Sequence, residues 1–396
     1  MLDNDTYMSE KSTLTIKLAL FTFVISFVIF FGIFYLKIPT DLQDHVYGLT
    51  LILKNHSFPI PPLYYFLLYL FSGFSADIGA LSNVAIVILS LAVALKYYYS
   101  VDLIAGFYPN KKIDPLLNVA IWLFIFSAPI VYNYKQMLFG RIATNFWHNS
   151  TTILLMPFAL LLLSHSIKFL QLKQPEIKNV ISIVFLGIIN LLIKPSFLFP
   201  FIPTFLIMVG LTSGLRSQLF KTAFYIALTL GALIFLEYYS IYKMTVIDAV
   251  RFKNDAKGLT IKPFYTFLMF SDGSWAVMLL NFLAGLLFPV FCCLFFFKDI
   301  LKEKGLIYVG ILFLIAFLIG TLITEQGIMA SNGNFLWQLH ISNYILFLFL
   351  IKFIYDKFIQ NSKIDKRILL LIITFSIHVL SGFLYLAKIF YLRKYS

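Results

Sequence analysis

Charged side chains are scarce in this chain of 396 residues. Lys, Arg, Asp and Glu make up 12% of it, hydrophobic residues make up 60%, and the mean hydropathy is +0.89. A soluble protein is usually about 25% charged and about 45–50% apolar. The shortage of charge therefore excludes a soluble enzyme, a soluble nucleic-acid-binding domain, a coiled coil and a disordered chain. It favours a protein whose helices face lipid.

Cysteine and the common catalytic motifs are also nearly absent. The two cysteines, Cys292 and Cys293, are adjacent in an apolar run, so they offer neither a disulfide framework nor a metal-binding pair. The sequence contains no Walker lysine after a Gly-rich loop, no Gly-x-Ser-x-Gly elbow and no His-Glu-x-x-His motif. The residues identify no cofactor. A divalent metal would be compatible with the carboxylates described below, but no metal-binding pattern indicates one.

Long apolar runs dominate the chain, and a membrane-spanning helix needs roughly 20 such residues. The candidate spans are 15–36, 116–133, 151–167, 179–193, 195–213, 222–242, 274–297, 306–324, 342–355 and 368–387. The stretch 61–97 is interrupted at 75–79, and we expect it to make one net crossing. The sequence thus predicts an all-α polytopic transmembrane helix bundle of about 11 spans, with residues 1–396 forming a single integral-membrane domain.

The net charge of +13 is distributed in short Lys and Arg clusters between the apolar runs, as membrane orientation and anionic headgroups favour. With a cytoplasmic N-terminus, most clusters face the cytoplasm. These are Lys96, Lys111 and Lys112; Lys168, Lys173 and Lys178; Arg216 and Lys221; Lys298, Lys302 and Lys304; and Lys357, Lys363, Lys366 and Arg367. The outer face then carries the loops 37–60, 134–150, 243–273 and 325–341.

The first outer loop, 37–60, contains Thr40 followed by Gln43, a capping-box pattern that predicts a helix beginning at Thr40. One face of this helix is apolar. We therefore predict a short helix that lies in the membrane interface with its apolar stripe toward lipid. The stripe consists of Val46, Leu49 and Leu53.

Asp41, Asp44 and His45 are three or four residues apart and share another face of this helix. A carboxylate beside low-dielectric surroundings becomes a stronger base through desolvation, so Asp44 and its neighbour Asp41 are candidate catalytic bases. The alternative is that Asp41 only stabilises the helix N-terminus and that Asp44 and His45 are solvated.

The second outer loop concentrates Arg, Trp, His and amide side chains just before an apolar span. Its candidate ligand-binding residues are Arg141, Asn145, Trp147 and His148. An aromatic platform beside hydrogen-bond donors suits a sugar or phosphate subsite, whereas a Trp at this depth equally suits an interfacial belt. Lys194, at the outer end of another span, either snorkels to water or faces a phosphate.

The third outer loop, 243–273, is basic and contradicts the positive-inside tendency. Its cations are Lys243, Arg251, Lys253, Lys257 and Lys262. Either the topology is wrong at this loop, or the loop binds an anionic headgroup such as a lipid phosphate or diphosphate.

The fourth outer loop, 325–341, has no Lys or Arg and is rich in Asn, Gln and Gly. Amide donors and stacking rings of this kind recognise hydroxyl-rich ligands such as sugars. The alternative is an ordinary polar turn with an interfacial Trp. The candidate binding residues of this loop are Glu325, Asn334, Trp337, Gln338 and His340.

The first span, the acidic outer loop with its interfacial helix, and the stretch Pro61-Pro62-Leu63-Tyr64-Tyr65 together resemble the GT-C class of integral-membrane glycosyltransferases, which includes the protein O-mannosyltransferases and the bacterial aminoarabinose transferases. His56 with this stretch is similar to the family's His-Pro-Pro-Leu segment, although here His56 is separated from the prolines. The resemblance implies an active-site carboxylate in the first outer loop, at the position of Asp44 with Asp41 as its neighbour. It also implies a sugar donor carried on a polyprenyl phosphate.

Together these patterns predict a glycosyltransferase at the outer face of the bacterial inner membrane. It would move a hexose or pentose from a polyprenyl-phosphate donor to a glycan, lipid or protein acceptor in cell-surface glycan assembly. Asp44 would act as the base, and basic residues would stabilise the phosphate leaving group. The expected partners are the donor, the acceptor and membrane lipids, and no nucleic acid. Two alternatives stay open: an O-antigen-type polysaccharide polymerase that relies on Arg141 and Arg251, and a non-enzymatic flippase or exporter of a lipid-linked glycan.

Overall fold

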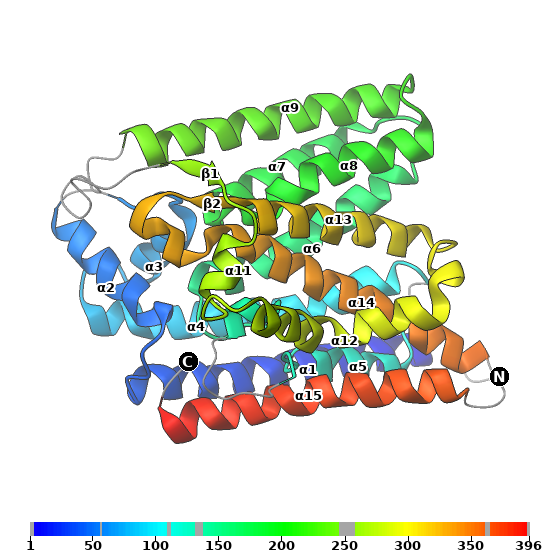
Figure 1. The fold of residues 1–396 in the computed structure, drawn as a ribbon, viewed down its shortest axis with the longest axis horizontal. Coiled ribbons are helices and arrows are strands. Elements are labelled where there is room, and N and C mark those ends of the chain that lie inside the picture. Colours follow the sequence, from blue (N-terminus) through cyan, green and yellow to red (C-terminus); the bar gives the residue numbers. More distant parts are fainter. Residues whose placement is uncertain are drawn as a thin grey trace.

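The computed structural model describes residues 4–55, 58–108, 112–130, 138–244, 258–360 and 365–393. Its long helices run side by side along one common direction, and successive helices run in alternating directions (Figure 1). In the described part of the chain, nine helices are long and apolar enough to cross a membrane. The prediction of many long apolar helices is therefore confirmed; the fold is nearly all-α and compatible with an integral-membrane protein.

The long helices are α1 (Asn4–Tyr35), α4 (Ile78–Ala105), α6 (Ser150–Leu170), α8 (Leu198–Ser213), α9 (Gln218–Tyr239), α12 (Trp275–Ile300), α13 (Lys304–Leu322), α14 (Trp337–Gln360) and α15 (Lys366–Leu392). The shorter ones are α2 (Asp41–Lys54), α3 (Leu63–Phe71), α5 (Pro115–Phe124), α7 (Ile177–Ile193) and α11 (Tyr265–Met269). Short 3-10 turns are η2 (Leu138–Arg141), η3 (Pro195–Phe197), η5 (Gly327–Asn332) and η6 (Asn334–Leu336), and η4 (Ser240–Met244) is a π-helical turn.

One end of the bundle carries α2, α3 and two short strands, and we call it the α2 end (Figure 1). Strands β1 (Leu259–Ile261) and β2 (Ile323–Glu325) pair antiparallel, with Leu259 opposite Glu325. This pairing joins the third and fourth predicted outer loops. All four predicted outer loops therefore contribute described residues to the same end of the bundle.

The interrupted stretch 61–97 forms the short helix α3 and the long helix α4. Asp77 ends the interruption, because its carboxylate accepts a hydrogen bond from the backbone N–H of Ala80 at 2.8 Å and so caps α4. α3 has nine residues and is too short to span a bilayer. α4 continues to Ala105, beyond the predicted limit at residue 97.

The predicted span 116–133 is wrong as a continuous helix. α5 ends at Phe124, and no helix resumes before Pro129, because Pro129 has no backbone N–H and disfavours a helical residue before it. The described residues 125–129 and 142–149 lie buried in the bundle with little helical structure. Their polar backbone is satisfied by other helices: Ala128 N–H donates to His378 at 3.0 Å, and the Asn343 amide donates to the Ile142 carbonyl at 2.7 Å.

Two glycines allow this non-helical backbone to lie directly against helices. A Cβ at Gly382 of α15 would lie 1.6 Å from the Phe126 carbonyl oxygen, and a Cβ at Gly285 of α12 would lie 1.9 Å from that of Arg141. No larger residue fits at either position without a shift of backbone. Irregular backbone at membrane depth is tolerated only where protein surrounds it, and these contacts meet that condition.

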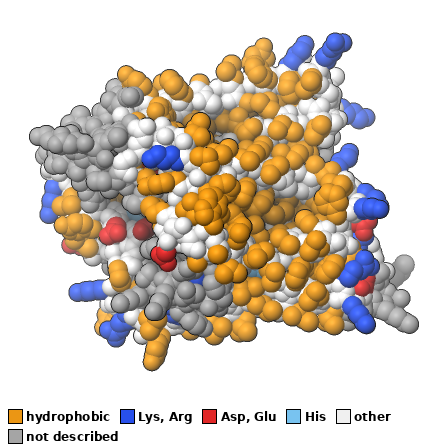
Figure 2. Space-filling view, viewed as in Figure 1, with side chains coloured by type: hydrophobic (Ala, Val, Ile, Leu, Met, Phe, Trp, Pro, Cys, Tyr) orange, Lys and Arg blue, Asp and Glu red, His pale blue; other side chains and the backbone are white. Residues whose placement is uncertain are grey.

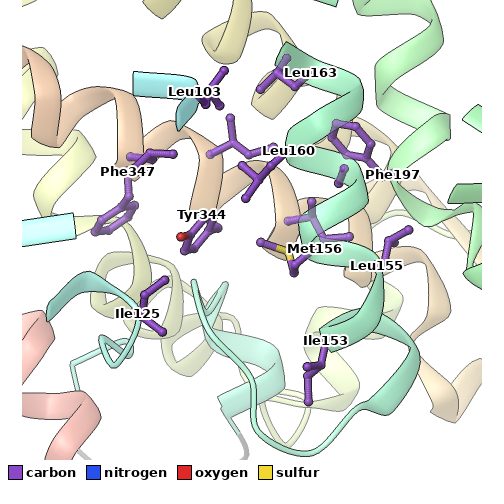
Figure 3. Packing of buried hydrophobic residues seen from close by; sticks show 14 of the residues in the cluster. Leu103, Ile125, Ile153, Leu155, Met156, Leu160, Leu163, Phe197, Tyr344 and Phe347 are labelled. Atoms are coloured by element: carbon purple, nitrogen blue, oxygen red, sulfur yellow. The ribbon is translucent and has the colours of Figure 1, made fainter. Parts of the chain in front are cut away.

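The core lies around α14 and α6. In α14, 89% of the most apolar window is buried, compared with 28% in α1. Figure 3 shows Leu160 and Leu163 of α6 facing Tyr344 and Phe347 of α14. The visible outer surface is a broad apolar band, and Lys and Arg side chains gather at the ends of the helices (Figure 2).

Two predictions about individual residues are corrected by this packing. Lys96 does not belong to a cytoplasmic cluster, because it lies inside α4 with 7% of its surface exposed. The apolar stripe of α2 does not face lipid, because Val46 and Leu49 are 1% and 0% exposed and belong to the protein core.

Candidate polar site at the α2 end

Helix α2 begins where the sequence predicted, with Thr40 as its N-cap residue, but the capping box does not form. The Gln43 amide donates to the Ile33 carbonyl of α1 at 3.2 Å instead of reaching back to Thr40. This contact fixes α2 against the end of α1. Asp41 and His45 are consequently half-buried, whereas Asp44 is exposed.

Asp41 is held by the second loop. Its carboxylate accepts a hydrogen bond from the Asn149 side-chain amide at 3.0 Å. Asn149 is itself the N-cap of α6, since its side-chain oxygen accepts from the Thr152 N–H at 3.0 Å. One amide side chain thus caps a helix and binds the carboxylate of another.

Lys194 follows α7 in extended backbone just before Pro195, where a helix cannot continue. Its ammonium donates to the side-chain oxygens of Asn149 at 3.3 Å and Thr152 at 3.2 Å, and it lies 4.4 Å from the centre of the Trp337 ring. Within the described part of the chain, no ion pair joins Lys194 to a carboxylate.

Burial lowers the pKa of Lys194 to about 7, while the charges of Asp41 and Glu325 oppose the decrease. Lys194 is therefore close to half-protonated at neutral pH. An amine in this state can hold an anion when protonated and releases it when it loses its proton.

Glu325 supplies a second carboxylate near Lys194. It is 4% exposed, and its two oxygens accept from the Tyr242 hydroxyl at 2.5 Å and the Asn334 amide at 2.8 Å. Burial raises the pKa of Glu325, and the hydrogen bonds and the charge of Lys194 oppose the increase. The fourth predicted loop therefore contributes to the same polar cluster as the first two.

His45 lines the opposite side of Asp41. Its Nδ1 and the Tyr65 hydroxyl of α3 are 2.6 Å apart. Burial lowers the pKa of His45 to about 4, Asp41 opposes the decrease and Lys194 adds to it. The imidazole is therefore neutral at pH 7 and serves as a hydrogen-bonding group, not as a cation.

An aromatic layer lies beneath Lys194. The ring centre of Phe146 lies 5.0 Å from that of Trp337 and 4.5 Å from that of His340, and the rings of His148 and Trp337 are 5.7 Å apart. Burial, reinforced by Lys194, lowers the pKa of His148 to about 3. These rings separate the polar cluster from the interior.

Three residues of the second loop lie away from this cluster. Trp147 is 3% exposed and packs on Phe30 and Phe126 of the core, so it does not present a free face for sugar stacking. Asn145 is buried and binds backbone carbonyls of the non-helical segment. The backbone of Arg141 packs against α12 at Gly285.

The remaining predicted site residues divide into described and undescribed ones. Gln338 is fully buried and donates to the Phe335 carbonyl at 2.5 Å, and His340 Nδ1 lies 3.2 Å from the Ala143 carbonyl oxygen. Lys262 is exposed with its ammonium 5.0 Å from the Tyr265 ring centre. His56, Lys243, Arg251, Lys253 and Lys257 lie outside the residues or side chains that the structure describes.

An apolar groove of about 350 Å³ lies beside the polar cluster, between α3 and the end of α7. Its lining residues are Phe58, Pro62, Leu63, Phe66 and Leu192. Leu192 precedes Lys194 by two residues, and Tyr65, which contacts His45, lies on the same short helix as Leu63 and Phe66. The two helices that line the groove are therefore the one that carries Tyr65 and the one that leads into Lys194.

The name "Lys194 cluster" is used below for Asp41, His45, Asn149, Lys194, Glu325 and Trp337. Asn149, Thr152, Tyr65 and Tyr242 were not among the predicted site residues, although a polar residue just before an apolar span is the usual signal for an N-cap such as Asn149.

Among the described residues, no group of three or more His, Cys, Asp and Glu could hold a metal ion. No family model matches the chain, and no curated protein sequence matches it.

Proposed function

We propose that this chain is an integral-membrane glycosyltransferase that moves a hexose or pentose from a polyprenyl-phosphate donor to an acceptor hydroxyl. The observation that carries the proposal is the surroundings of Lys194: two nearby carboxylates, a Trp ring at 4.4 Å and an adjoining apolar groove. A lipid-linked sugar has three matching parts, namely an anionic phosphate, a hydroxyl-rich ring and an apolar chain.

Lys194 binds the phosphate in this proposal. Its hydrogen bonds go to neutral oxygens of Asn149 and Thr152, so its charge is not neutralised by a direct ion pair. A bound phosphate would favour the protonated amine and would receive a charge-assisted hydrogen bond. The sugar would then lie beside Lys194, with the half-buried Asn334 as a hydrogen-bonding group, while Trp337, which is 3% exposed, contacts Lys194 from the buried side.

The polyprenyl chain occupies the groove between α3 and α7. The lining is apolar throughout. Isoprene units next to the phosphate would otherwise meet water at the level of the lipid headgroups, so their burial against this surface is favourable. Because the polyprenyl chain stays at membrane depth, the donor can reach the site without being extracted from lipid.

Asp41 is the preferred base, in place of its neighbour Asp44. Its carboxylate takes the proton of the acceptor hydroxyl as the acceptor oxygen attacks the anomeric carbon. The bond between that carbon and the phosphate oxygen breaks, and the phosphate leaves with the electron pair while Lys194 neutralises its charge. One displacement of this kind inverts the anomeric configuration. The resemblance to the GT-C class supports a carboxylate at this place.

The α2 end would face the outer side of the bacterial inner membrane. The opposite ends of the helices carry most Lys and Arg clusters, which is the arrangement that cytoplasmic loops favour. Eleven crossings follow if α7 and the segment that begins with α5 also traverse the bilayer, in addition to the nine long apolar helices.

The test is transfer by the purified protein in liposomes that contain undecaprenyl-phosphate-linked hexoses or pentoses and a panel of glycan and lipid acceptors. We expect a product with inverted anomeric configuration, and we expect Asp41→Asn to abolish it while donor binding persists. Full transfer by Asp41→Asn would remove Asp41 from the mechanism. Loss of activity only with Arg141→Ala would favour a polymerase, and movement of unchanged lipid across the membrane would favour a flippase.

A further inference from the structure

Lys96 is a buried amine in the interior of α4 that no role above explains. It is 7% exposed, its amine donates a hydrogen bond to the side-chain oxygen of Asn145, and it lies 3.9 Å from the ring centre of Tyr344. A lysine within membrane-spanning helices is costly, and it is usually retained for a function. No carboxylate among the described residues forms an ion pair with it.

Asn145, the hydrogen-bond partner of Lys96, binds the backbone where α5 ends and the non-helical segment begins. The amide nitrogen of Asn145 donates to the carbonyl of Phe124, the last residue of α5, at 2.9 Å and to that of Ser127, just beyond it, at 3.0 Å. The amide can serve these carbonyls only if its oxygen points the other way, and that oxygen is the group that Lys96 binds. Lys96 therefore selects the orientation in which Asn145 holds the segment.

The held segment leads directly into the Lys194 cluster. Asn149, four residues after Asn145, binds both Asp41 and Lys194. A cavity of about 20 Å³ is bordered by Lys96, Asn145 and also Thr152, the second oxygen that Lys194 contacts. This volume holds one water molecule and no larger ligand. Lys96 is thus adjacent to the polar cluster on its buried side but does not reach a substrate.

We propose that Lys96 is a positioning residue that, through Asn145, sets the location of Asn149 between Asp41 and Lys194. The inference depends on the proposed function only in treating Asn149 as a site residue. The geometry itself can be measured without any transfer reaction.

The experiment crosslinks the two ends of the Asp41–Asn149 contact. Cys292 and Cys293 are replaced by Ala, the double variant Asp41→Cys/Asn149→Cys is made in that background, and a bifunctional methanethiosulfonate with a two-carbon spacer is added to the purified protein. Crosslink yield is read from intact mass. We expect the Lys96→Met substitution to remove most of the crosslink, because Asn145 loses the donor that orients it.

The matched control is Tyr97→Phe, which removes a buried hydrogen bond to Asn118 from the next residue of the same helix. It should leave the yield unchanged. Equal loss with Tyr97→Phe, or a full yield in a monodisperse Lys96→Met protein, would overturn the proposal. If Lys96→Met is not monodisperse, Lys96→Gln takes its place: this side chain keeps a shorter, neutral donor, so an intermediate yield is expected and a parental yield would contradict the proposal.

The readout also separates this inference from the proposed function. Transfer is measured separately in the parent protein, which keeps Asp41 and Asn149. Loss of the crosslink, together with no transfer by the parent protein, would support the role of Lys96 and contradict the transferase. An unchanged crosslink, together with transfer by the parent protein, would do the reverse.

Discussion

The two ends of the helix bundle use the same ionic residue types in different ways. At the end opposite α2, lysines and arginines pair directly with acids. Lys302 and Lys357 lie 3.3 Å and 2.9 Å from Asp299, and Arg367 lies 2.6 Å from Asp365. These pairs are partly exposed, and ion pairs of this kind contribute little free energy and are screened by salt.

At the α2 end, neutral groups separate the charges. Lys194 bonds to the oxygens of Asn149 and Thr152, Asp41 bonds to the Asn149 amide, and Glu325 bonds to Tyr242 and Asn334. A cation that is kept from direct pairing in a buried place is poorly stabilised in the absence of a ligand, and its lowered pKa expresses this. The comparison supports the proposal that the α2 end binds an anion, because the cations named at the other end already have carboxylate partners.

The largest expected effect is on transfer by Asp41→Asn. Removal of the base should lower the rate about 10²-fold or more, because a positioned general base contributes about 10²–10⁴-fold. Asp272→Asn is the matched control at the same end. Asp272 is exposed with a φ of 52°, which Asn also adopts readily, so its replacement should leave transfer and stability unchanged. Transfer kinetics in liposomes check both variants.

The next effect concerns the non-helical segment that supports the α2 end. Gly382→Ala should destabilise the protein by about 3 kcal/mol, since the new Cβ meets backbone that cannot shift freely. Gly231→Ala in α9, where nothing lies within 4 Å of a new Cβ, should leave the midpoint of thermal unfolding unchanged. A similar decrease of the unfolding midpoint in both variants would contradict this prediction, because it would show that the contact between Gly382 and the Phe126 backbone does not cause the destabilisation.

A third prediction uses the pKa of Lys194, which lies near 7. A polyprenyl-phosphate sugar keeps one negative charge at neutral pH, so its affinity should follow the protonated fraction of Lys194. Affinity should be highest below pH 7 and should fall up to about tenfold for each pH unit above it. Lys194→Arg stays charged and should give a flat profile. A pH-dependent profile in the Arg variant would assign the titration to another group.

A smaller effect should distinguish the two tryptophans of the predicted subsites, Trp337 and Trp147. Trp337→Phe should raise the donor KM by roughly two- to fivefold, because it weakens a cation–π contact worth about 0.5–1 kcal/mol. Trp147→Phe should instead lower the unfolding midpoint and leave KM unchanged, since Trp147 packs in the core. Steady-state kinetics and thermal unfolding separate the two outcomes.

The smallest effect is expected at the end opposite α2. Lys302→Gln removes an exposed partner of Asp299, which Lys357 continues to bind. Neither donor affinity nor the unfolding midpoint should change measurably. A clear decrease in donor affinity would contradict the difference drawn between the two ends.

Most of the helices could be predicted from the sequence because length and apolar composition decide them. The span 116–133 could not. Its helix ends at Phe124, and the backbone that follows packs inside the protein where Gly382, far away in sequence, leaves room for Phe126. No local sequence pattern predicts that a backbone segment packs against a glycine so distant in sequence.

Part of the candidate site was also predictable. Asp41, His45, Lys194, Glu325 and Trp337 were all identified as polar residues at the ends of apolar runs, and the fold brings them together. The direction of a side chain was not predictable. Asp44 shares the sequence neighbourhood of Asp41, yet α2 is turned by its own buried stripe so that Asp44 is exposed.

The buried residues of the second loop show the same limit. Trp147 and Asn145 have the composition of a sugar subsite, but tertiary packing turns them inward. Lys96 was assigned to a loop by its charge alone, although its position within an apolar run could have indicated a buried role. Tyr65 and Tyr242 carry no sequence signal that separates them from the many other tyrosines.

Photo-crosslinking of a donor tests the central claim most directly. An undecaprenyl-phosphate sugar with a diazirine in its first isoprene unit would be illuminated with the protein in liposomes, and the adducts would be mapped by mass spectrometry. Adducts should fall on Leu63, Phe66 and Leu192 of the groove, and Lys194→Met should reduce them. Adducts spread over the lipid-facing helices, or concentrated at the end opposite α2, would contradict the assignment of the Lys194 cluster as the donor site.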